Sequence, residues 1–450
     1  MDPLESNDVG RAGLGKKLIL AAVSLGLVVT TAATVVRAQG SGNSWWEFLP
    51  SFGNADNGPR HASDNDKRRP NELDDLRSGP TPLRSEIMIE ALEDAIRRYQ
   101  RIVSNGGWRT IPGARIQPED DEVRMPRLLQ RLTITGELRR RQSEGVGFAD
   151  SAEIHAALRR FQNKNGLRVT GYVDIPTLQA LNVPAEVRLV QLRVNLQRLR
   201  ELIAQNMEHR YILVNVPAFQ LEAVERHQVE QRHRIIAGKT ERPTPTVRAA
   251  IKALNFFPYW RVPESVATLD LIPRLVKDPE FLRKEQIRVL AGTYNGPEID
   301  PHNIDWSQAD AAKLKFRQDQ GPLNALGLVR LDMPNEHGVY MHDTPAKDLF
   351  DRPVRALSAG CVRVQDVFSL VEWVARYEPG WERPGRVQEV LASGNASDLN
   401  LTQPVSVYFA YITAWAEPDG TIQFRPDIYA RDGTGERHER GPASPLALAP

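Results

Sequence analysis

The spacing of apolar residues changes once along the chain, near residue 208, and this change constrains the fold more than any other feature. Before it, apolar side chains recur every three or four residues, as in amphipathic helices, in segments 85–103, 151–165 and 185–205. After it, runs rich in β-branched and aromatic residues predict strands at 211–216, 221–224, 234–237, 247–254, 405–415 and 421–424. The sequence therefore predicts an α+β protein whose second half is mostly β, with one helix at 364–376.

The N-terminus contains an uncharged apolar run at residues 18–36, directly after the basic pair Lys16 and Lys17. A basic segment followed by an apolar core is typical of an export signal, and Ala38 offers a small residue for cleavage. The run is also close to the length that crosses a bilayer, so it could stay in place as a single membrane anchor. We therefore expect an exported protein.

The chain contains one cysteine, Cys361, which excludes an internal disulfide framework. A lone thiol in an oxidising compartment is a hazard unless it has a use. Small residues precede it, and the amides of Gly360 and Cys361 could form an oxyanion hole. The nearest preceding histidines are His342 and His337, and an imidazole could take the thiol proton. From these residues alone, a buried structural thiol remains as good an interpretation as a catalytic one.

These residues resemble the catalytic motif of the L,D-transpeptidases, the YkuD-type domain, in which a histidine precedes a Ser-His-Gly-Cys sequence. The motif reads Ser-Ala-Gly-Cys at 358–361 here, so Ala359 stands where the family has histidine. Tyr-Met-His-Asp-Thr-Pro at 340–345 and Gly-Pro-Leu-Asn-Ala-Leu-Gly at 321–327 are similar to the large YcbB-like subgroup. The stretch at 255–263 is a further likeness.

The resemblance implies roles for individual residues. Cys361 would be the acyl-enzyme nucleophile and His342 its base. Among the other motif residues, Tyr340 would line a substrate channel, Gly360 would help to hold the oxyanion, and Arg363 would support the motif from the sheet. Ser358 is expected to belong to the same oxyanion and substrate site. No cofactor or metal is expected, because the histidines show no ligand-spaced cluster and no glycine-rich phosphate loop is present.

A second resemblance covers residues 157–182, which are similar to the small three-helix peptidoglycan-binding domain. The shared pattern is Phe-Gln, Gly-Leu, Thr-Gly and then Thr-Leu-x-Ala-Leu-Asn. The apolar members of this pattern are expected to form the core of the domain rather than a binding surface: Phe161, Leu167, Leu178 and Leu181.

Composition and resemblance together divide the chain. Residues 39–82 are rich in small, polar and charged residues and predict disorder, and a long polar insertion between strands is typical of a lid. The predicted parts are a signal peptide or membrane anchor (1–38), a disordered linker (39–82), a helical scaffold (83–206) containing the peptidoglycan-binding domain (about 120–183), a catalytic domain (207–432) with a helical capping insertion (about 263–318), and a loose tail (433–450).

The resemblance implies an enzyme of the periplasm that joins peptidoglycan stem peptides by 3→3 crosslinks through a cysteine thioester. Stem peptides and glycan would be its partners, and a formal net charge of +1 gives no basic footprint for nucleic acid. If water took the acyl group, the same residues would make an L,D-carboxypeptidase or amidase. If a protein lysine took it, they would attach envelope proteins to the wall. A non-catalytic wall-binding scaffold is the alternative that Ala359 suggests.

Overall fold

The computed structural model describes residues 75–113, 123–138, 151–204 and 208–433. The predicted signal or anchor segment, residues 39–74 of the predicted linker and residues 434–450 of the predicted tail lie outside the described residues. No helix in the described ranges is long and apolar enough to cross a membrane.

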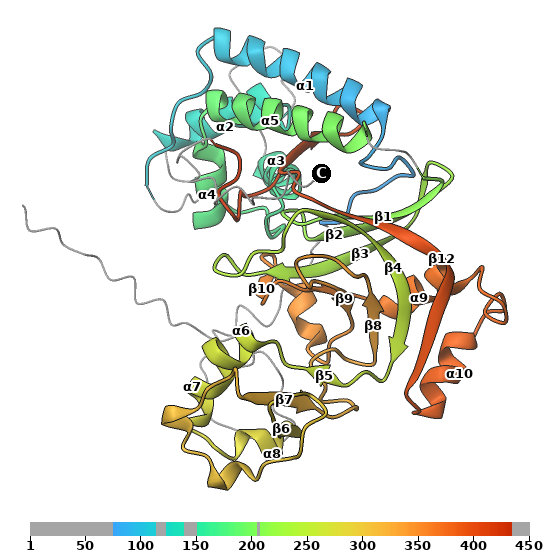
Figure 1. The fold of residues 1–450 in the computed structure, drawn as a ribbon. Helices are drawn as coiled ribbons and strands as arrows, with labels where there is room; N and C mark the ends of the chain where they lie inside the picture. The colour runs from blue at the N-terminus through green and yellow to red at the C-terminus, as the bar shows by residue number, and fades with distance from the viewer. Residues whose placement is uncertain (1–74, 114–122, 139–150, 205–207, 434–450) are drawn as a thin grey trace, which may run out of the picture. The chain divides into compact units, whose positions relative to one another are not determined.

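Two long helices, α1 (Glu86–Ser104) and α5 (Ala185–Ile203), pack side by side (Figure 1). They confirm the helices predicted at 85–103 and 185–205. Three of their periodic leucines are fully buried: Leu92, Leu192 and Leu199. These helices share one apolar cluster with residues of the β half: Tyr211, Leu213, Tyr408 and Trp415. The helices therefore cover part of the sheet with the same apolar stripe that made them recognisable in the sequence.

Three shorter helices, α2 (Arg124–Thr135), α3 (Ser151–Lys164) and α4 (Ile175–Asn182), surround a separate apolar core. Only α3 was predicted, because eight residues in α4 give too few turns for a periodic pattern. Phe161, Leu178 and Leu181 are buried in this core, as expected. The buried amide of Gln162 donates to Thr177 Oγ1 at 3.0 Å and accepts from the Gly171 amide at 2.8 Å. The Phe-Gln and Thr-Gly pattern is therefore explained by internal packing.

Nine strands form the main sheet in the order β10-β3-β11-β9-β8-β4-β12-β1-β2, and β2 also pairs with β3. This extra pairing brings the β2 end of the strand order back to β3. The first four strands fall where strands were predicted. The strand bounds are β1 Arg210–Asn215, β2 Gln220–Glu225, β3 Gln228–Gly238, β4 Val247–Phe256, β8 Val329–Asp332, β9 Met341–His342, β10 Ala356–Ser358, β11 Val362–Val364 and β12 Ser397–Ala410.

The helix predicted at 364–376 is α9 (Val367–Ala375), which begins three residues later because Val364 belongs to β11. The strand predicted at 405–415 is divided, since β12 ends at Ala410 and β13 covers Ala414–Ala416. β13 pairs with β14 (Ile422–Phe424), which confirms the predicted strand at 421–424. The helix α10 (Arg386–Ser393) was not predicted. Valines and leucines of α9 pack into the main apolar cluster of the sheet.

The insertion predicted to be helical contains short helices at 264–275 and 281–284, and also a three-stranded sheet that was not predicted. Its strands are β5 (Trp260–Arg261), β6 (Ile287–Ala291) and β7 (Leu314–Gln318), in the order β5-β7-β6. The strands escaped notice because each has five residues or fewer and carries charged residues on its outer face. Short helices connect them: α6 Glu264–Val266, α7 Ile272–Leu275 and α8 Phe281–Lys284, with a π-helical turn at Ala267–Leu271. Trp306 and Phe316 lie in an apolar cluster of the insertion's own.

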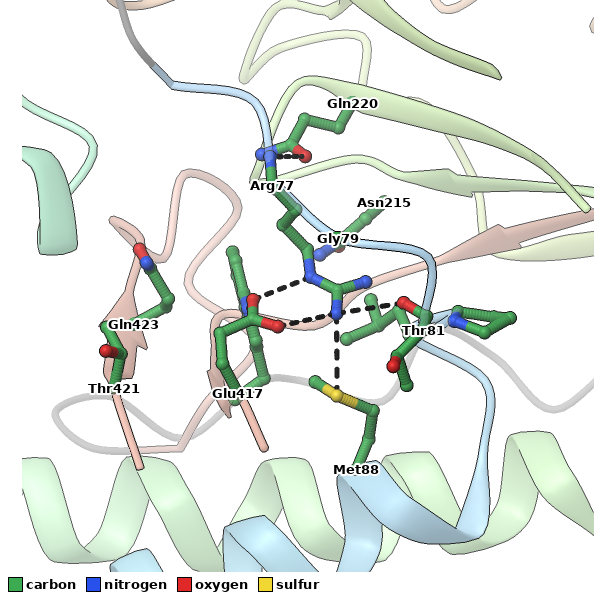
Figure 2. Close-up of polar contacts among 12 residues, drawn as sticks. Arg77, Gly79, Thr81, Met88, Asn215, Gln220, Glu417, Thr421 and Gln423 are labelled. Carbon is green, nitrogen blue, oxygen red and sulfur yellow. Dashed lines mark hydrogen bonds and ion pairs between the residues drawn. The ribbon is translucent and has the colours of Figure 1, made fainter. Parts of the chain in front are cut away.

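Residues 75–82, predicted as the end of a disordered linker, are packed against the β half. Arg77 is buried, and its guanidinium forms two hydrogen bonds of 2.8 Å with Glu417 and one of 2.6 Å with Glu222. Figure 2 shows the guanidinium between Glu417, Thr81 and Met88. We call Arg77, Glu222 and Glu417 the Arg77 cluster. The polar composition of residues 75–82 predicted disorder, but the ion pairs of this cluster hold the segment in place before α1.

Candidate active site

The strand pair β9 and β11 sets the direction of the predicted site residues. The two strands run parallel, with Met341 beside Val362 and His342 beside Arg363. Met341 and Val362 are fully buried in the core of the main sheet. Because successive side chains on a strand alternate, His342 and Arg363 face the opposite side. Cys361, one residue before Val362, lies at the start of β11 on that same side.

These side chains line a cavity of about 150 Å³ between the sheet and the insertion. Five of the six predicted site residues contribute to its wall: Tyr340, His342, Ser358, Cys361 and Arg363. The insertion and the loop before β8 supply an apolar wall made up of Trp260, Pro263, Val266, Ala325 and Leu326. The thiol, the imidazole and a cationic side chain therefore share one apolar-walled space.

His342 is buried and held in one tautomer. Its Nδ1 lies 2.5 Å from the backbone oxygen of Asp343. A carbonyl oxygen can only accept, so Nδ1 carries the proton and Nε2 is left as the acceptor. Burial, followed by the charge of Arg363, lowers the pKa of His342 to about 3. The imidazole is therefore neutral at pH 7 and free to take a proton on Nε2.

The residue that holds His342 is itself fixed. The Asp343 carboxylate accepts a hydrogen bond from the Leu328 amide at 3.0 Å and forms an ion pair with Lys347. Gly327 has a φ of +62°, and a Cβ there would lie 2.3 Å from Asp343 Oδ2. The last glycine of the 321–327 stretch is thus required by the close approach of this carboxylate.

Cys361 is half-buried, and its surroundings favour the protonated thiol. Burial raises the pKa of the Cys361 thiol, while hydrogen bonds from Tyr340 and the charge of Arg363 act in the opposite direction. Burial also raises the pKa of Tyr340 well above its usual value, so its phenol is neutral. The resting pair is a neutral thiol beside a neutral imidazole, so the proton must leave sulfur as the sulfur attacks.

Ser358 organises the loop that carries the thiol. Its hydroxyl donates to the backbone oxygen of Cys361 at 2.6 Å and accepts from the Gly360 amide at 3.1 Å. The Gly360 amide, expected to hold an oxyanion, is therefore already bound. Within the described residues, the Cys361 amide has no hydrogen-bond acceptor of its own. The prediction of two oxyanion donors is thereby reduced to one in this conformation, the amide of Cys361.

Sequence reasoning missed Arg330, on β8. It lies opposite His342 in the sheet, and its guanidinium is 5.5 Å from the centre of the Tyr340 ring. A hydrogen bond of 3.0 Å to Asn255 Oδ1 holds it in place. Its charge adds to the lowering of the pKa of His342 and opposes the rise in the pKa of Cys361. No local motif marks this arginine, and only the pairing of β8 with β9 brings it to the site.

Ala359, the departure from the family motif, contacts the insertion. Together with Tyr340 it packs against the insertion's apolar cluster, and it lines the cavity. An imidazole at this position would have to place polar nitrogens against that apolar surface. The small apolar side chain of Ala359 is therefore compatible with the apolar surface of the insertion.

His337 lies at the edge of the site. Its side chain is 42% exposed and lies 3.5 Å from Glu336. It lines the active-site cavity and also a larger groove of about 650 Å³ beside α5 and the start of β4. The larger groove contains neither Cys361 nor His342, so size alone does not locate the chemistry in this molecule.

The fold and the cavity define the class: a β-sheet domain with a lone thiol beside a neutral histidine, closed on one side by an insertion. Residues 209–393 match the family model of the YkuD L,D-transpeptidase catalytic domain. Residues 149–181 match a model described as "Putative peptidoglycan binding domain". One segment of the chain is thus similar to the YkuD L,D-transpeptidase catalytic domain, and a second is similar to a peptidoglycan-binding domain.

A curated protein of Haemophilus influenzae, named "Putative L,D-transpeptidase", is 33% identical over 259 residues. The match covers 57% of this chain and 50% of that protein, so the chain spans about half the length of this relative.

Two solved structures are similar at low scores. One is an L,D-transpeptidase from Xylanimonas cellulosilytica, with a TM-score of 0.21 and 14% identity over 66% of this chain and 98% of that one. The other is the Ldtfm-avibactam carbamoyl enzyme, with a TM-score of 0.21 and 12% identity over 59% and 84%. Scores this low do not establish a shared fold.

Proposed function

We propose that the chain is a peptidoglycan L,D-transpeptidase that forms 3→3 crosslinks through a thioester on Cys361. One observation carries the proposal: the chain's single thiol shares an apolar-walled cavity with His342, whose Nδ1 is tied to a carbonyl and whose Nε2 is left to accept. The matched catalytic domain supplies the reaction class.

In the first step, Cys361 Sγ attacks the carbonyl carbon of the third residue of a donor tetrapeptide stem. The thiol proton passes to His342 Nε2, and the developing oxyanion accepts from the Cys361 amide. His342 then returns the proton to the nitrogen of the terminal D-amino acid, which leaves as the C–N bond breaks. The low pKa of His342, about 3, makes its protonated form a strong acid for this leaving group.

In the second step, the side-chain amine of an acceptor stem attacks the thioester. The amine loses a proton to His342, an amide bond forms, and the sulfur leaves and regains a proton from the imidazolium. The products are a crosslinked pair of stems and the free thiol. Tyr340 and Arg363 line the same cavity and would contact the donor stem.

The acceptor decides between this reaction and its rivals, L,D-carboxypeptidase or amidase activity and attachment of envelope proteins. The insertion's apolar wall, formed by residues such as Trp260 and Val266, favours an amine over water because it limits solvent at the thioester. The insertion would act as a lid over the cleft. The alternative of a non-catalytic wall-binding scaffold accounts less well for a histidine held in the acceptor tautomer beside the only thiol.

The peptidoglycan-binding domain would keep the enzyme on its polymeric substrate. The basic and apolar N-terminal sequence supports export to the periplasm, with the segment either cleaved or kept as an inner-membrane anchor.

The acyl-enzyme can be tested directly. The purified protein is mixed with a donor tetrapeptide stem without an acceptor, quenched in acid and weighed by intact-mass spectrometry. We expect one added tripeptide acyl mass on wild type and none on Cys361→Ser or Cys361→Ala. An adduct that persists on either variant would show that another residue carries the acyl group. A folded wild type that never gains the mass would refute the proposal.

A further inference from the structure

A buried threonine far from the motif holds the loop that carries the thiol. Thr244 has no exposed surface, and its hydroxyl donates to the backbone oxygen of Gly360 at 2.7 Å. The same hydroxyl accepts from the amide of Gly238 at 2.8 Å. The hydroxyl proton is thus committed to Gly360, which fixes the side chain in one orientation.

We propose that Thr244 and Tyr429 are positioning residues that aim the Cys361 amide at the oxyanion of the acyl transfer. This inference rests on the proposed function. It concerns the one peptide unit whose carbonyl belongs to Gly360 and whose N–H belongs to Cys361.

The geometry of a peptide bond carries the argument. In a planar trans peptide the C=O and the following N–H point in opposite directions. Anchoring the Gly360 oxygen on Thr244 therefore sets the direction of the Cys361 N–H. Gly360 has a φ of +121°, a region that residues with a side chain rarely adopt. Its amide is held by Ser358, so the peptide is fixed on both sides of Gly360.

Tyr429 completes the support from the C-terminal part of the described chain. Its hydroxyl donates to the Gly238 oxygen at 2.5 Å and accepts from the Thr244 amide at 3.2 Å. Its ring stacks on Tyr411 with 5.6 Å between centres, and its amide donates to the Tyr411 hydroxyl at 2.8 Å. The turn that carries Thr244 is thereby fixed at both of its ends.

The same turn contacts the insertion, because Arg242 forms an ion pair with the buried Asp270. The Thr244 turn thus touches the thiol loop, the C-terminal segment and the insertion. In the family motif a histidine precedes the Gly-Cys pair, and here that position is Ala359. Thr244 and Ser358 supply the polar contacts that hold this chain's loop.

The test compares acylation rates among matched variants. Thr244→Val keeps the shape of the side chain and removes the hydroxyl, whereas Thr244→Ser keeps the hydroxyl. Tyr429→Phe removes only the phenol hydroxyl that supports the backbone of Gly238 and Thr244. Thr246→Val, an exposed threonine two residues along the same turn, is the control. Single-turnover acylation by a donor tetrapeptide stem is measured, together with alkylation of Cys361 by iodoacetamide over a range of pH.

We expect Thr244→Val to slow acylation by about 10- to 100-fold, the scale of a misplaced catalytic group. Thr244→Ser should recover most of that loss, Tyr429→Phe should lose less than Thr244→Val, and Thr246→Val should match wild type. The pH profile of alkylation should stay unchanged in all of them, because alkylation forms no oxyanion.

Acylation by Thr244→Val within about twofold of wild type would overturn the inference, as would an equal loss of alkylation, which would indicate a merely structural role. If Thr244→Val does not fold, the acylation rates of Tyr429→Phe and Thr244→Ser test the inference instead. A folded Tyr429→Phe that is acylated at the wild-type rate would then contradict the inference. A wild-type protein that is alkylated but never acylated would overturn the proposed function and this inference with it.

Discussion

The Arg77 cluster and the active-site cavity each bury an arginine side chain. The surroundings shift the pKa of Arg77 and that of Arg363 in opposite directions. Burial alone would lower the pKa of Arg77, but Glu222 and Glu417 more than offset it and raise that pKa. In the cavity, burial lowers the pKa of Arg363 to about 10, and the charge of the nearby thiol opposes this shift without cancelling it. The pKa of the buried arginine is therefore raised in the Arg77 cluster and lowered in the cavity.

This difference separates a structural site from a candidate catalytic one. A buried charge with well-placed partners holds two segments together, and removing one partner strands the other. Groups whose pKa values are shifted by burial can serve as acids or bases in catalysis. Such groups therefore cluster at functional sites. Mutations should therefore affect folding at the Arg77 cluster and chemistry in the cavity.

The largest effect is expected from His342→Ala. Loss of a positioned base should slow acylation by about 10²- to 10⁴-fold while the fold is retained. His337→Ala is the matched control, and its effect should be much smaller because that side chain lies at the edge of the cavity. Single-turnover acylation with a tetrapeptide stem measures both. The reverse ranking would mean that His337, rather than His342, is the base.

Arg77→Ala should lower the free energy of unfolding by about 3–4 kcal/mol, because the buried Glu222 and the part-buried Glu417 would lose the guanidinium they share, although Arg232 would still pair with Glu222. Acylation per folded molecule should be unchanged. The control is Arg97→Ala, whose ion pair with Asp94 is exposed on α1 and should matter by less than about 1 kcal/mol. Urea unfolding monitored by circular dichroism provides the comparison, and equal losses for the two variants would contradict it.

A smaller effect is expected from pH. The pKa of His342 is about 3 when folded and about 6.5 when unfolded, so the unfolded chain binds the extra proton between these values. The free energy of unfolding should therefore fall as pH drops below about 6.5. From pH 7 to 4, wild type should lose roughly 3 kcal/mol more than His342→Gln.

His233, whose pKa burial also lowers, acts in the same direction in both proteins and cancels in the difference. Denaturation at several pH values measures the two curves. Parallel curves for wild type and His342→Gln would show that His342 is not held neutral by its surroundings.

Structural features that depend on residues close in sequence could be predicted from the sequence. Features that depend on contacts between residues far apart in sequence could not. The helices α1, α3 and α5 and the first four strands are long enough to show their periodicity. β6 and β7 are too short and charged for that. The Cys361 motif is local and was found, whereas Thr244 contacts Gly360 from 116 residues away and Arg330 arrives through strand pairing. Neither of the latter two carries a pattern of its own.

The order of residues 75–82 shows the same limit. Their composition resembles that of the preceding segment, and only the carboxylates of Glu222 and Glu417 explain why Arg77 is buried. Those partners lie far along the chain and become visible only when β2 and the segment after β13 are placed. Ion pairs over such separations are set by the fold and leave no mark in local composition.

The central claim is that Cys361 transfers a stem peptide to the amine of another stem. The most direct test incubates the purified protein with disaccharide tetrapeptides and sequences the products by tandem mass spectrometry. We predict dimers joined between the third residues of two stems, formed by wild type and absent with Cys361→Ser. Tripeptides alone, with no dimer at any acceptor concentration, would contradict the account and indicate a carboxypeptidase.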